Sequence, residues 1–252
     1  MFTTKVTQAA RILQEARHAV ALTGAGISTP SGIPDFRSPG TGLWETVDAL
    51  EVSSLEGFQR RPQAFYDWIR LRARTMRQAQ PNPAHLALAE LERRGIIKAL
   101  ITQNIDSLHV RAGSQNVLEV HGNLRTLTCL KCYRQVATES IIDKFLADGE
   151  VPRCTCGGVL KPDVVLFGEM LPVQVFHRAQ QEAENCDAML VAGSSLEVAP
   201  VSALPGLALR HGAQLIIVNK MATDYDRLAH VVLHEDVAEA LPQILSSVVR
   251  GP

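Results

Sequence analysis

Short apolar runs alternate with amphipathic helical stretches along most of this chain, and this alternation limits the folds open to it. Strand patterns cover residues 18–22, 96–101, 117–120, 188–192 and 215–218. Helical periodicity covers residues 4–17, 65–78, 84–94, 172–185, 201–211 and 236–249, and Pro242 is expected to kink or break the last of these. The alternation predicts an α/β fold with a doubly wound parallel sheet.

Polar residues or glycines follow each predicted strand. They are Thr23-Gly24, Gln103-Asn104, His121-Gly122, Gly193-Ser194-Ser195 and Asn219. In doubly wound sheets, ligands bind at the carboxyl edge of the strands. We therefore expect these five segments, which are distant in sequence, to converge on one cleft.

The first of these segments, residues 22–37, reads LTGAGISTPSGIPDFR. Glycines after a strand let the backbone approach a pyrophosphate, which indicates a nucleotide or dinucleotide near Gly24. The segment departs from the dehydrogenase fingerprint, because Thr29 stands where G-x-G-x-x-G requires glycine. No strand that ends in an acidic residue follows about 20 residues later, as ribose recognition in that fingerprint would require.

Residues 124–163 interrupt the alternation and contain four of the five cysteines. The four are Cys129, Cys132, Cys154 and Cys156, a C-x-x-C pair and a C-x-C pair. Two close pairs suit a tetrahedral Zn²⁺ with four thiolate ligands, which leaves no open position and is therefore structural. Free or redox-active cysteines are the alternative. Cys186, which stands alone before a strand, is interpreted as a buried apolar side chain.

The composition excludes some classes of partner. The 252 residues carry a formal net charge of −1, which offers no broad field for nucleic acid or an anionic membrane. The N-terminus lacks a long apolar stretch, and no apolar run approaches the roughly 18 residues of a membrane span. We expect a cytoplasmic protein with no membrane and no specific nucleic-acid partner, acting as a monomer.

Taken together, the motifs resemble those of the sirtuins, the NAD-dependent protein lysine deacylases, and are most similar to bacterial and archaeal members. The resemblance rests on GAGIS at 24–28, GIPDFR at 32–37, TQNID at 102–106, His121-Gly122, the four cysteines, FGE at 167–169, GSS at 193–195 and Val218-Asn219. It implies a large Rossmann-like domain (residues 1–123 and 164–252) and a small zinc-binding module (residues 124–163), with a helical cofactor-loop region around 37–80.

The resemblance further implies that NAD is consumed as a co-substrate. The acetyl oxygen of acetyl-lysine attacks C1′ of the nicotinamide ribose, and the products are deacetylated lysine, nicotinamide and 2′-O-acetyl-ADP-ribose. The implied catalytic residues are His121, as general base, with Asn104 and Asp106. The implied cofactor-binding residues are Gly24, Ala25, Gly26, Ser28, Thr29, Asp35, Phe36, Arg37, Gln103, Asn104, Ile105, Asp106, His121, Gly193, Ser194, Ser195, Asn219, Lys220, Asp236 and Val237. The implied peptide-binding residues are Val165, Leu166, Phe167, Gly168, Glu197 and Val198.

Each implied role has a plainer alternative. A histidine titrates near neutrality and suits a general base, but a lone histidine after a strand is more often structural. Asp106 could simply cap a short helix at 107–112, the serines after Gly193 could cap a helix, and Phe36 could hold its loop in place. The other seven histidines lack a motif context and are interpreted as surface or packing residues.

The resemblance also bears on the acyl group. Sirtuins that prefer succinyl or malonyl groups carry Tyr-x-x-Arg on the helix after the cofactor loop, and here Tyr66 is followed by Ile69 at the arginine position. Arg70 lies about 100° further around the helix and should point elsewhere. Because an unpaired buried carboxylate is costly, we expect deacetylation, with tolerance for propionyl or longer neutral chains.

Two other functions remain open from the sequence. ADP-ribosyl transfer or NAD hydrolysis would share the nicotinamide-releasing step, but the peptide-binding segments and His121 argue against either as the main activity. A non-catalytic NAD- or zinc-dependent binding module would have lost part of the catalytic set, and none is lost here. A nucleic-acid-binding zinc finger is disfavoured because acidic residues offset the basic residues of the cysteine-containing insertion.

Overall fold

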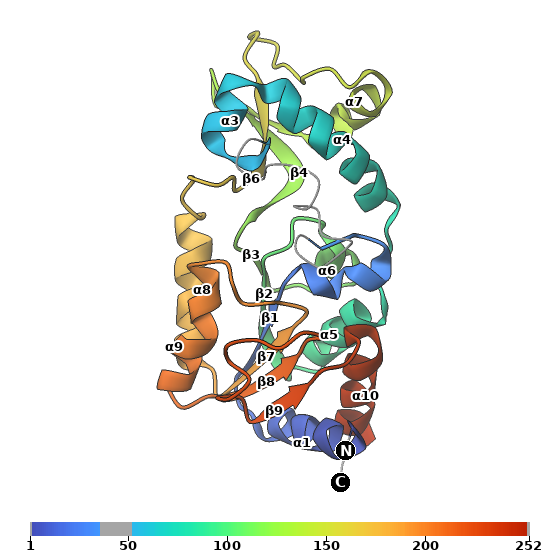
Figure 1. Cartoon of the computed structure of the whole chain (residues 1–252), viewed down its shortest axis with the longest axis vertical. Coiled ribbons are helices and arrows are strands. Elements are labelled where there is room, and N and C mark those ends of the chain that lie inside the picture. The colour runs from blue at the N-terminus through green and yellow to red at the C-terminus, as the bar shows by residue number, and fades with distance from the viewer. Residues whose placement is uncertain (1, 36–51, 251–252) are drawn as a thin grey trace.

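The computed structural model describes residues 2–35 and 52–250, and two sheets lie at opposite ends of the described molecule (Figure 1). The larger sheet contains β1 (Ala19–Thr23), β2 (Ile97–Thr102), β3 (Val117–Glu119), β7 (Ala188–Ala192), β8 (Gln214–Val218) and β9 (Val231–Leu233). Its strand order is β3-β2-β1-β7-β8-β9, and every pairing is parallel. The predicted parallel α/β sheet is therefore confirmed, and β9 is an addition that the sequence patterns did not predict.

Helices cover both faces of this sheet. One face packs on α1 (Phe2–Glu15), α5 (Pro83–Arg93) and α10 (Val237–Arg250), and the other on α8 (Val173–Asn185) and α9 (Leu204–Arg210). Figure 1 shows these two helical layers on either side of the strands. β1 and β7 are buried along their whole length, as expected for central strands with helices on both faces.

Local signals define several element ends as predicted. Asn82 is the N-cap of α5 and Pro83 its first residue, and the Asn82 side chain accepts from the Ala84 amide at 2.9 Å. Cys186 is buried and its thiol donates to the Ala183 carbonyl, which confirms it as a packing residue.

Of the two outcomes expected at Pro242, the break was wrong, because α10 continues through it from Val237 to Arg250, and the kink stays a prediction. The proline removes one helical hydrogen bond. A continuous stripe of buried side chains, which includes Leu241 and Ile244, holds this helix on the sheet and outweighs that loss.

The smaller sheet contains β4 (Gly122–Cys129), β5 (Gln135–Ala137) and β6 (Leu160–Val164), in the antiparallel order β5-β4-β6. It is packed with α3 (Leu55–Arg60), α4 (Pro62–Gln78) and α7 (Ile142–Asp148) around a cluster of aromatic side chains. Phe58, Phe65, Tyr66 and Phe145 meet there mainly edge to face, with ring centroids 5.2–6.0 Å apart. The division of the chain into two domains stays a prediction, although the smaller sheet spans nearly the predicted insertion.

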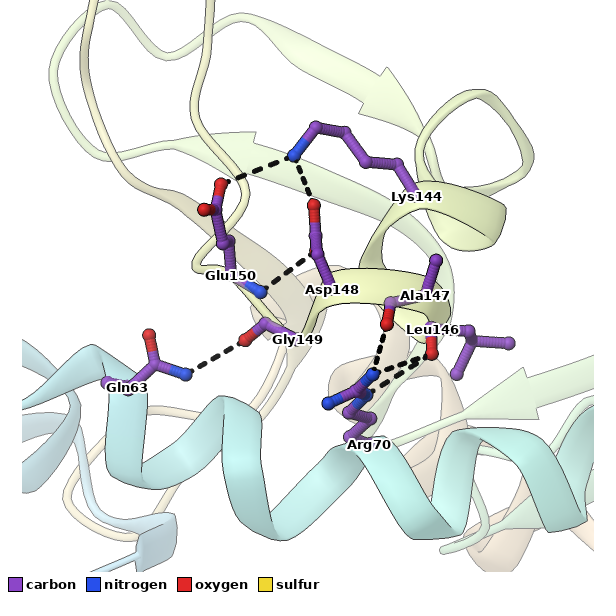
Figure 2. A network of polar contacts seen from close by, with 8 residues as sticks. All are labelled: Gln63, Arg70, Lys144, Leu146, Ala147, Asp148, Gly149 and Glu150. Carbon is purple, nitrogen blue, oxygen red and sulfur yellow. Dashed lines mark hydrogen bonds and ion pairs between the residues drawn. The ribbon is translucent and has the colours of Figure 1, made fainter.

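Polar contacts join α4 to the carboxyl end of α7 (Figure 2). The Arg70 guanidinium donates to the Leu146 carbonyl at 2.8 Å and to the Ala147 carbonyl at 2.6 Å. Gln63 donates to the Gly149 carbonyl one residue beyond the helix. These donors satisfy carbonyls that a helix end leaves without partners. These contacts therefore hold α4 against α7.

None of the helices in the described part of the chain combines the length and apolarity needed to cross a bilayer.

Candidate active site

A cavity of about 760 Å³ lies where the carboxyl ends of the parallel strands face the smaller sheet. It is lined by Gly24, Gln103, Asn104, His121, Gly193, Ser194, Ser195 and Asn219 from the five predicted segments. The predicted convergence of those segments is confirmed. It follows from the parallel order of the strands, which places their carboxyl ends at one edge.

The glycines after β1 are required by a close approach of two loops. A Cβ on Gly24 or Gly26 would lie 2.9 Å from the Gly193 carbonyl oxygen, and one on Gly193 would lie 2.2 Å from the Ile27 amide nitrogen. Gly26 donates to the Gly193 carbonyl at 2.8 Å. Glycine is therefore needed at these positions for loop packing, independently of any ligand.

Ser28, Asn104 and Asp106 form a hydrogen-bonded cluster beside the cavity. Ser28 Oγ donates to Asp106 Oδ2 at 2.6 Å and accepts from Asn104 Nδ2 at 3.1 Å. Asp106 Oδ1 accepts from the amide of Leu108, the first residue of α6 (Leu108–Arg111), although the N-cap position is Ser107 and not Asp106 as the plainer interpretation expected. Burial raises the pKa of Asp106, although the bonds from Ser28 and Leu108 oppose that shift.

His121 is held in one tautomer. Its Nδ1 lies 3.0 Å from the Gln103 carbonyl oxygen, which can only accept, so Nδ1 carries the proton. Nε2 then keeps its lone pair, and no hydrogen bond among the described residues uses it. Burial lowers the pKa of His121 despite the Gln103 bond, so the imidazole is neutral near pH 7. A neutral imidazole with a free Nε2 at a cavity wall can accept a proton.

Behind this cluster lies a buried pair of histidines, with ring centroids 4.8 Å apart. His85 Nε2 lies 3.5 Å from Ser28 Oγ, and His109 Nε2 lies 2.9 Å from Thr23 Oγ1. Burial lowers the pKa of His85 to about 4 and that of His109 well below its usual value. Both are buried packing residues, as expected of histidines outside the motifs, and His85 contacts Ser28 on the cavity wall.

Some predicted site residues lie off the cavity wall. Lys220 pairs with Asp236 at 2.8 Å, and Asp236 also caps α10 by accepting from the Ala238 amide. Val237 is buried in the core, and Thr29 donates to the Gly26 carbonyl. Phe36 and Arg37 lie outside the described residues. The roles of all of these stay predictions.

Other lining residues were missed from the sequence. Many come from α4, α8 and the residues before α8, namely Phe65, Trp68, Ile69, Met76, Met170, Leu171, Val173, Phe176, His177 and Gln180, and Ile33 comes from the loop after β1. Most of them are apolar, and an apolar residue on an amphipathic helix gives no sign of whether it faces a core or a cavity. The lining residues among those described include no lysine or arginine.

The segment 165–168 lies along the cavity with much of its backbone already bonded. Val165 donates to the His121 carbonyl and Phe167 to the Ser53 carbonyl, each at 2.9 Å. The Leu166 amide donates to Glu169 Oε2 at 2.8 Å. Val165, Leu166, Phe167 and Gly168 all line the cavity, as does Val198 from the facing segment, whereas Glu197 does not.

The four predicted metal ligands meet at one point of the smaller sheet. The Sγ atoms of Cys129, Cys132, Cys154 and Cys156 all lie within 4.8 Å of one another. The Cys129–Cys156 and Cys132–Cys154 separations are 3.5 and 3.7 Å. Four thiolates at tetrahedral Zn–S distances lie about 3.8 Å apart, so the donor set and its spacing fit Zn²⁺.

Backbone N–H groups favour the thiolate form of Cys129, one of the four cysteines. Backbone N–H groups, that of Cys132 first, lower the pKa of Cys129 to about 6, which favours the thiolate that binds metals. A Cβ on Gly158 would lie 2.6 Å from Cys129 Sγ. Gly158, the second residue after the C-x-C pair, is therefore needed to let the two cysteine pairs approach each other.

Comparison with known proteins agrees with this geometry. The model of the Sir2 family matches residues 24–200. The chain is 48% identical over 248 residues to NAD-dependent protein deacylase 2 of Archaeoglobus fulgidus, covering 98% of this chain and 97% of that one. It is 49% identical over 242 residues to the NAD-dependent protein deacetylase of Caldivirga maquilingensis, covering 96% and 93%.

Solved structures show the same fold. One, described as the structural basis for the mechanism and regulation of Sir2 enzymes, matches with a TM-score of 0.90 at 47% identity and covers 98% of both chains. A second, Sir2Af2 bound to a myristoylated histone peptide, matches with a TM-score of 0.84 at 43% identity and covers 98% and 97%. A third, a Sir2 variant with a deacetylated p53 peptide and 3′-O-acetyl ADP ribose, has a TM-score of 0.89 at 39% identity and covers 95% and 96%.

Proposed function

The chain belongs to the Sir2 family, and from this premise we propose that it is an NAD-dependent protein-lysine deacetylase. The observation that carries the proposal is the placement of a neutral His121, with Nε2 unused, beside the Ser28–Asn104–Asp106 cluster on one cavity wall. The reaction converts acetyl-lysine, NAD and water to lysine, nicotinamide and 2′-O-acetyl-ADP-ribose.

His121 acts as general base in this proposal. Its Nε2 accepts the proton of a ribose hydroxyl when that oxygen attacks the acyl carbon, and the Gln103 carbonyl keeps the ring oriented through Nδ1. Asp106 and Ile105 contact the nicotinamide carboxamide, and Asn104 positions the ribose or a water molecule. Supporting this, all three residues line the same cavity as His121.

NAD, which supplies the leaving nicotinamide and the ribose hydroxyls, is bound along the carboxyl edge of the larger sheet. Gly24, Ala25, Gly26 and Ser28 are proposed to hold the pyrophosphate side, and Gly193, Ser194, Ser195 and Asn219 the adenosine side. Supporting this, the Gly26 amide donates to the Gly193 carbonyl at 2.8 Å, so the two groups of residues are in direct contact.

The substrate peptide is proposed to add as a strand between segment 165–168 and Val198. Among the described residues, the Val165 carbonyl and the Gly168 amide have no internal hydrogen-bond partner, so both are open to a peptide backbone. Recognition through main-chain groups makes sequence selectivity loose. Because one chain supplies both segments, the enzyme works as a monomer in this proposal; its cytoplasmic location stays a prediction.

The preferred acyl group is neutral. Ile69 lines the cavity, and the Arg70 guanidinium is bonded to carbonyls of α7 on the other side of the helix (Figure 2), as its position in the sequence predicted. Tyr66 is also turned away, since its hydroxyl donates to the Leu160 carbonyl. An acyl carboxylate would find no cation among the described lining residues and would be buried unpaired.

A side-by-side assay tests the acyl preference. Acetyl-, propionyl-, myristoyl- and succinyl-lysine versions of one peptide are compared by kcat/KM at saturating NAD. We expect every neutral chain to be a better substrate than the succinyl group. A higher kcat/KM for the succinyl peptide would refute the preference while leaving the deacylase assignment intact.

Product analysis tests the activity itself. Mass spectrometry after incubation of an acetyl-lysine peptide should show deacetylation and O-acetyl-ADP-ribose only when NAD is present. Nicotinamide release that does not depend on the peptide would instead identify NAD hydrolysis or ADP-ribosyl transfer. The His121→Ala variant should lose deacetylation, and His211→Ala, an exposed histidine after α9, should keep it. Full activity of His121→Ala would refute the general-base role.

A further inference from the structure

Arg125 forms a three-way contact close to the active site. It lies on β4, four residues after His121, and its Nη1 donates to Glu119 Oε1 at 2.6 Å while Nη2 donates to Glu119 Oε2. Nη1 also donates to Ser107 Oγ at 2.7 Å. One guanidinium therefore joins β4, the last residue of β3 and the loop directly after Asp106.

The Ser107 contact holds an unfavourable backbone conformation. Ser107 has φ 60° and ψ 17°, in the left-handed region, which costs a residue other than glycine about 1–2 kcal/mol. This residue sets the direction of the chain between Asp106 and α6, and Asp106 in turn bonds Ser28 and the Leu108 amide. A loss of the Arg125 bond would release the turn that aims Asp106.

The Glu119 contact holds the end of β3, the strand that leads to His121. Glu119 ends β3, and the next residue, Val120, donates to the Thr102 carbonyl, so β3 and β2 deliver His121 and Gln103 to the cavity together. The Glu119 side chain is only 12% exposed, against 42% for Arg125. The Glu119 charge also adds to the effect of burial in raising the pKa of Asp106, and the Arg111 charge opposes it.

An ordinary surface ion pair contributes little, and an exposed arginine on a strand is usually one of these. Three features distinguish Arg125: the fork is bidentate, its partner is largely buried, and a third bond reaches Ser107. We propose that Arg125 is a positioning residue for the nicotinamide-releasing step, holding the loop of Asp106 and the strand of His121 in fixed relation. This inference rests on the proposed function.

The test compares Arg125→Met and Arg125→Lys with Arg11→Met, which removes an exposed Arg–Glu pair on α1 far from the cavity. Four quantities are measured: kcat/KM for NAD, inhibition by added nicotinamide, KM for the acetyl peptide and Kd for ADP-ribose, which lacks the nicotinamide. For Arg125→Met we expect kcat/KM for NAD to fall about tenfold or more, since a 1 Å misplacement costs roughly a hundredfold. Nicotinamide inhibition should weaken in parallel.

The remaining readouts separate positioning from general damage. The peptide KM and the ADP-ribose Kd should change much less than kcat/KM for NAD. The peptide segment is held by Ser53 and Glu169, and on the pyrophosphate side only Ser28 bonds the displaced loop. Arg125→Lys should fall between wild type and Arg125→Met, since an ammonium can pair with Glu119 or Ser107 but cannot form the fork. Arg11→Met should match wild type in every assay.

Three results would overturn the inference. The first is an unchanged kcat/KM for NAD in Arg125→Met, and the second is an equal loss in all four quantities for that variant. The third applies if Arg125→Met does not fold, and it is wild-type values of all four quantities in Arg125→Lys. Failure of the proposed function is seen separately, because wild-type protein would then show no NAD-dependent deacetylation. Active wild type with unaffected Arg125 variants would overturn the positioning role alone.

Discussion

A buried ion pair behind the peptide-binding segment allows a quantitative prediction. Lys161 is 8% exposed, and its Nζ lies 2.8 Å from Glu169 Oε2 and donates to the Val164 carbonyl at 2.8 Å. The same Glu169 oxygen accepts from the Leu166 amide. Lys161 therefore neutralises a carboxylate that closes the loop on which the proposed peptide site is built.

Replacing Lys161 with methionine should destabilise the protein strongly. At an effective dielectric constant of about 20, charges 2.8 Å apart attract by about 6 kcal/mol before desolvation is counted. Leaving one partner of a buried pair uncompensated costs about 3–5 kcal/mol. Because the Glu169 side chain is 22% exposed, we expect the low end, about 3 kcal/mol. For a chain of this length that loss lowers Tm by roughly 6–12 °C.

Urea unfolding and thermal melts of a double-mutant cycle measure this effect. Lys161→Met/Glu169→Gln removes both charges and keeps an acceptor for the Leu166 amide, so it should recover most of the loss. The control is Lys144→Met, an exposed lysine that pairs with Asp148 and Glu150 (Figure 2) and should cost less than about 1 kcal/mol. The reasoning would be refuted if Lys161→Met cost no more than Lys144→Met, or if the double variant were as unstable as the single one.

Three further predictions concern the metal, pH and helix contacts. Chelation of the metal at the four-cysteine site should speed hydrogen exchange throughout the smaller sheet while the larger sheet stays protected; equal loss in both sheets would contradict a local structural role. His85 and His109 are neutral in the folded protein, with lowered pKa values, and protonate near pH 6.5 when unfolded. The free energy of unfolding should therefore fall as pH drops from 6.5 towards 4, and urea titrations of His85→Gln should show a flatter dependence; an unaltered pH profile would exclude His85 as a source. Gly149→Ala combines a positive φ of 75° with a Cβ 2.4 Å from Arg70 Nη1, so thermal melts should show a larger loss than for Gly212→Ala, which has a φ of 90° and open space; equal losses would mean that Arg70 moves aside freely.

The carboxyl-edge residues could be predicted because each follows its own strand directly. Gln103, His121 and Gly193 follow buried apolar runs, and the parallel order of those runs brings them together without further information. The cysteine pairs were equally local, since ligand type and spacing define the site. Cavity walls from α4 and α8 could not be predicted, because the same helical periodicity serves a core and a cavity alike.

The sequence by itself determined the alternation of strands and helices, the zinc ligand set and the polar residues at the strand ends, since each depends on residues close together in the chain. Only the tertiary structure decided why Gly24 and Gly26 are glycines, because their neighbour is Gly193 from a loop far along the chain. It alone showed that Arg70 bonds α7 and that Arg125 joins Glu119 to Ser107. The physical reason is that a long side chain can reach several partners, and the fold decides which of them lies within hydrogen-bonding distance.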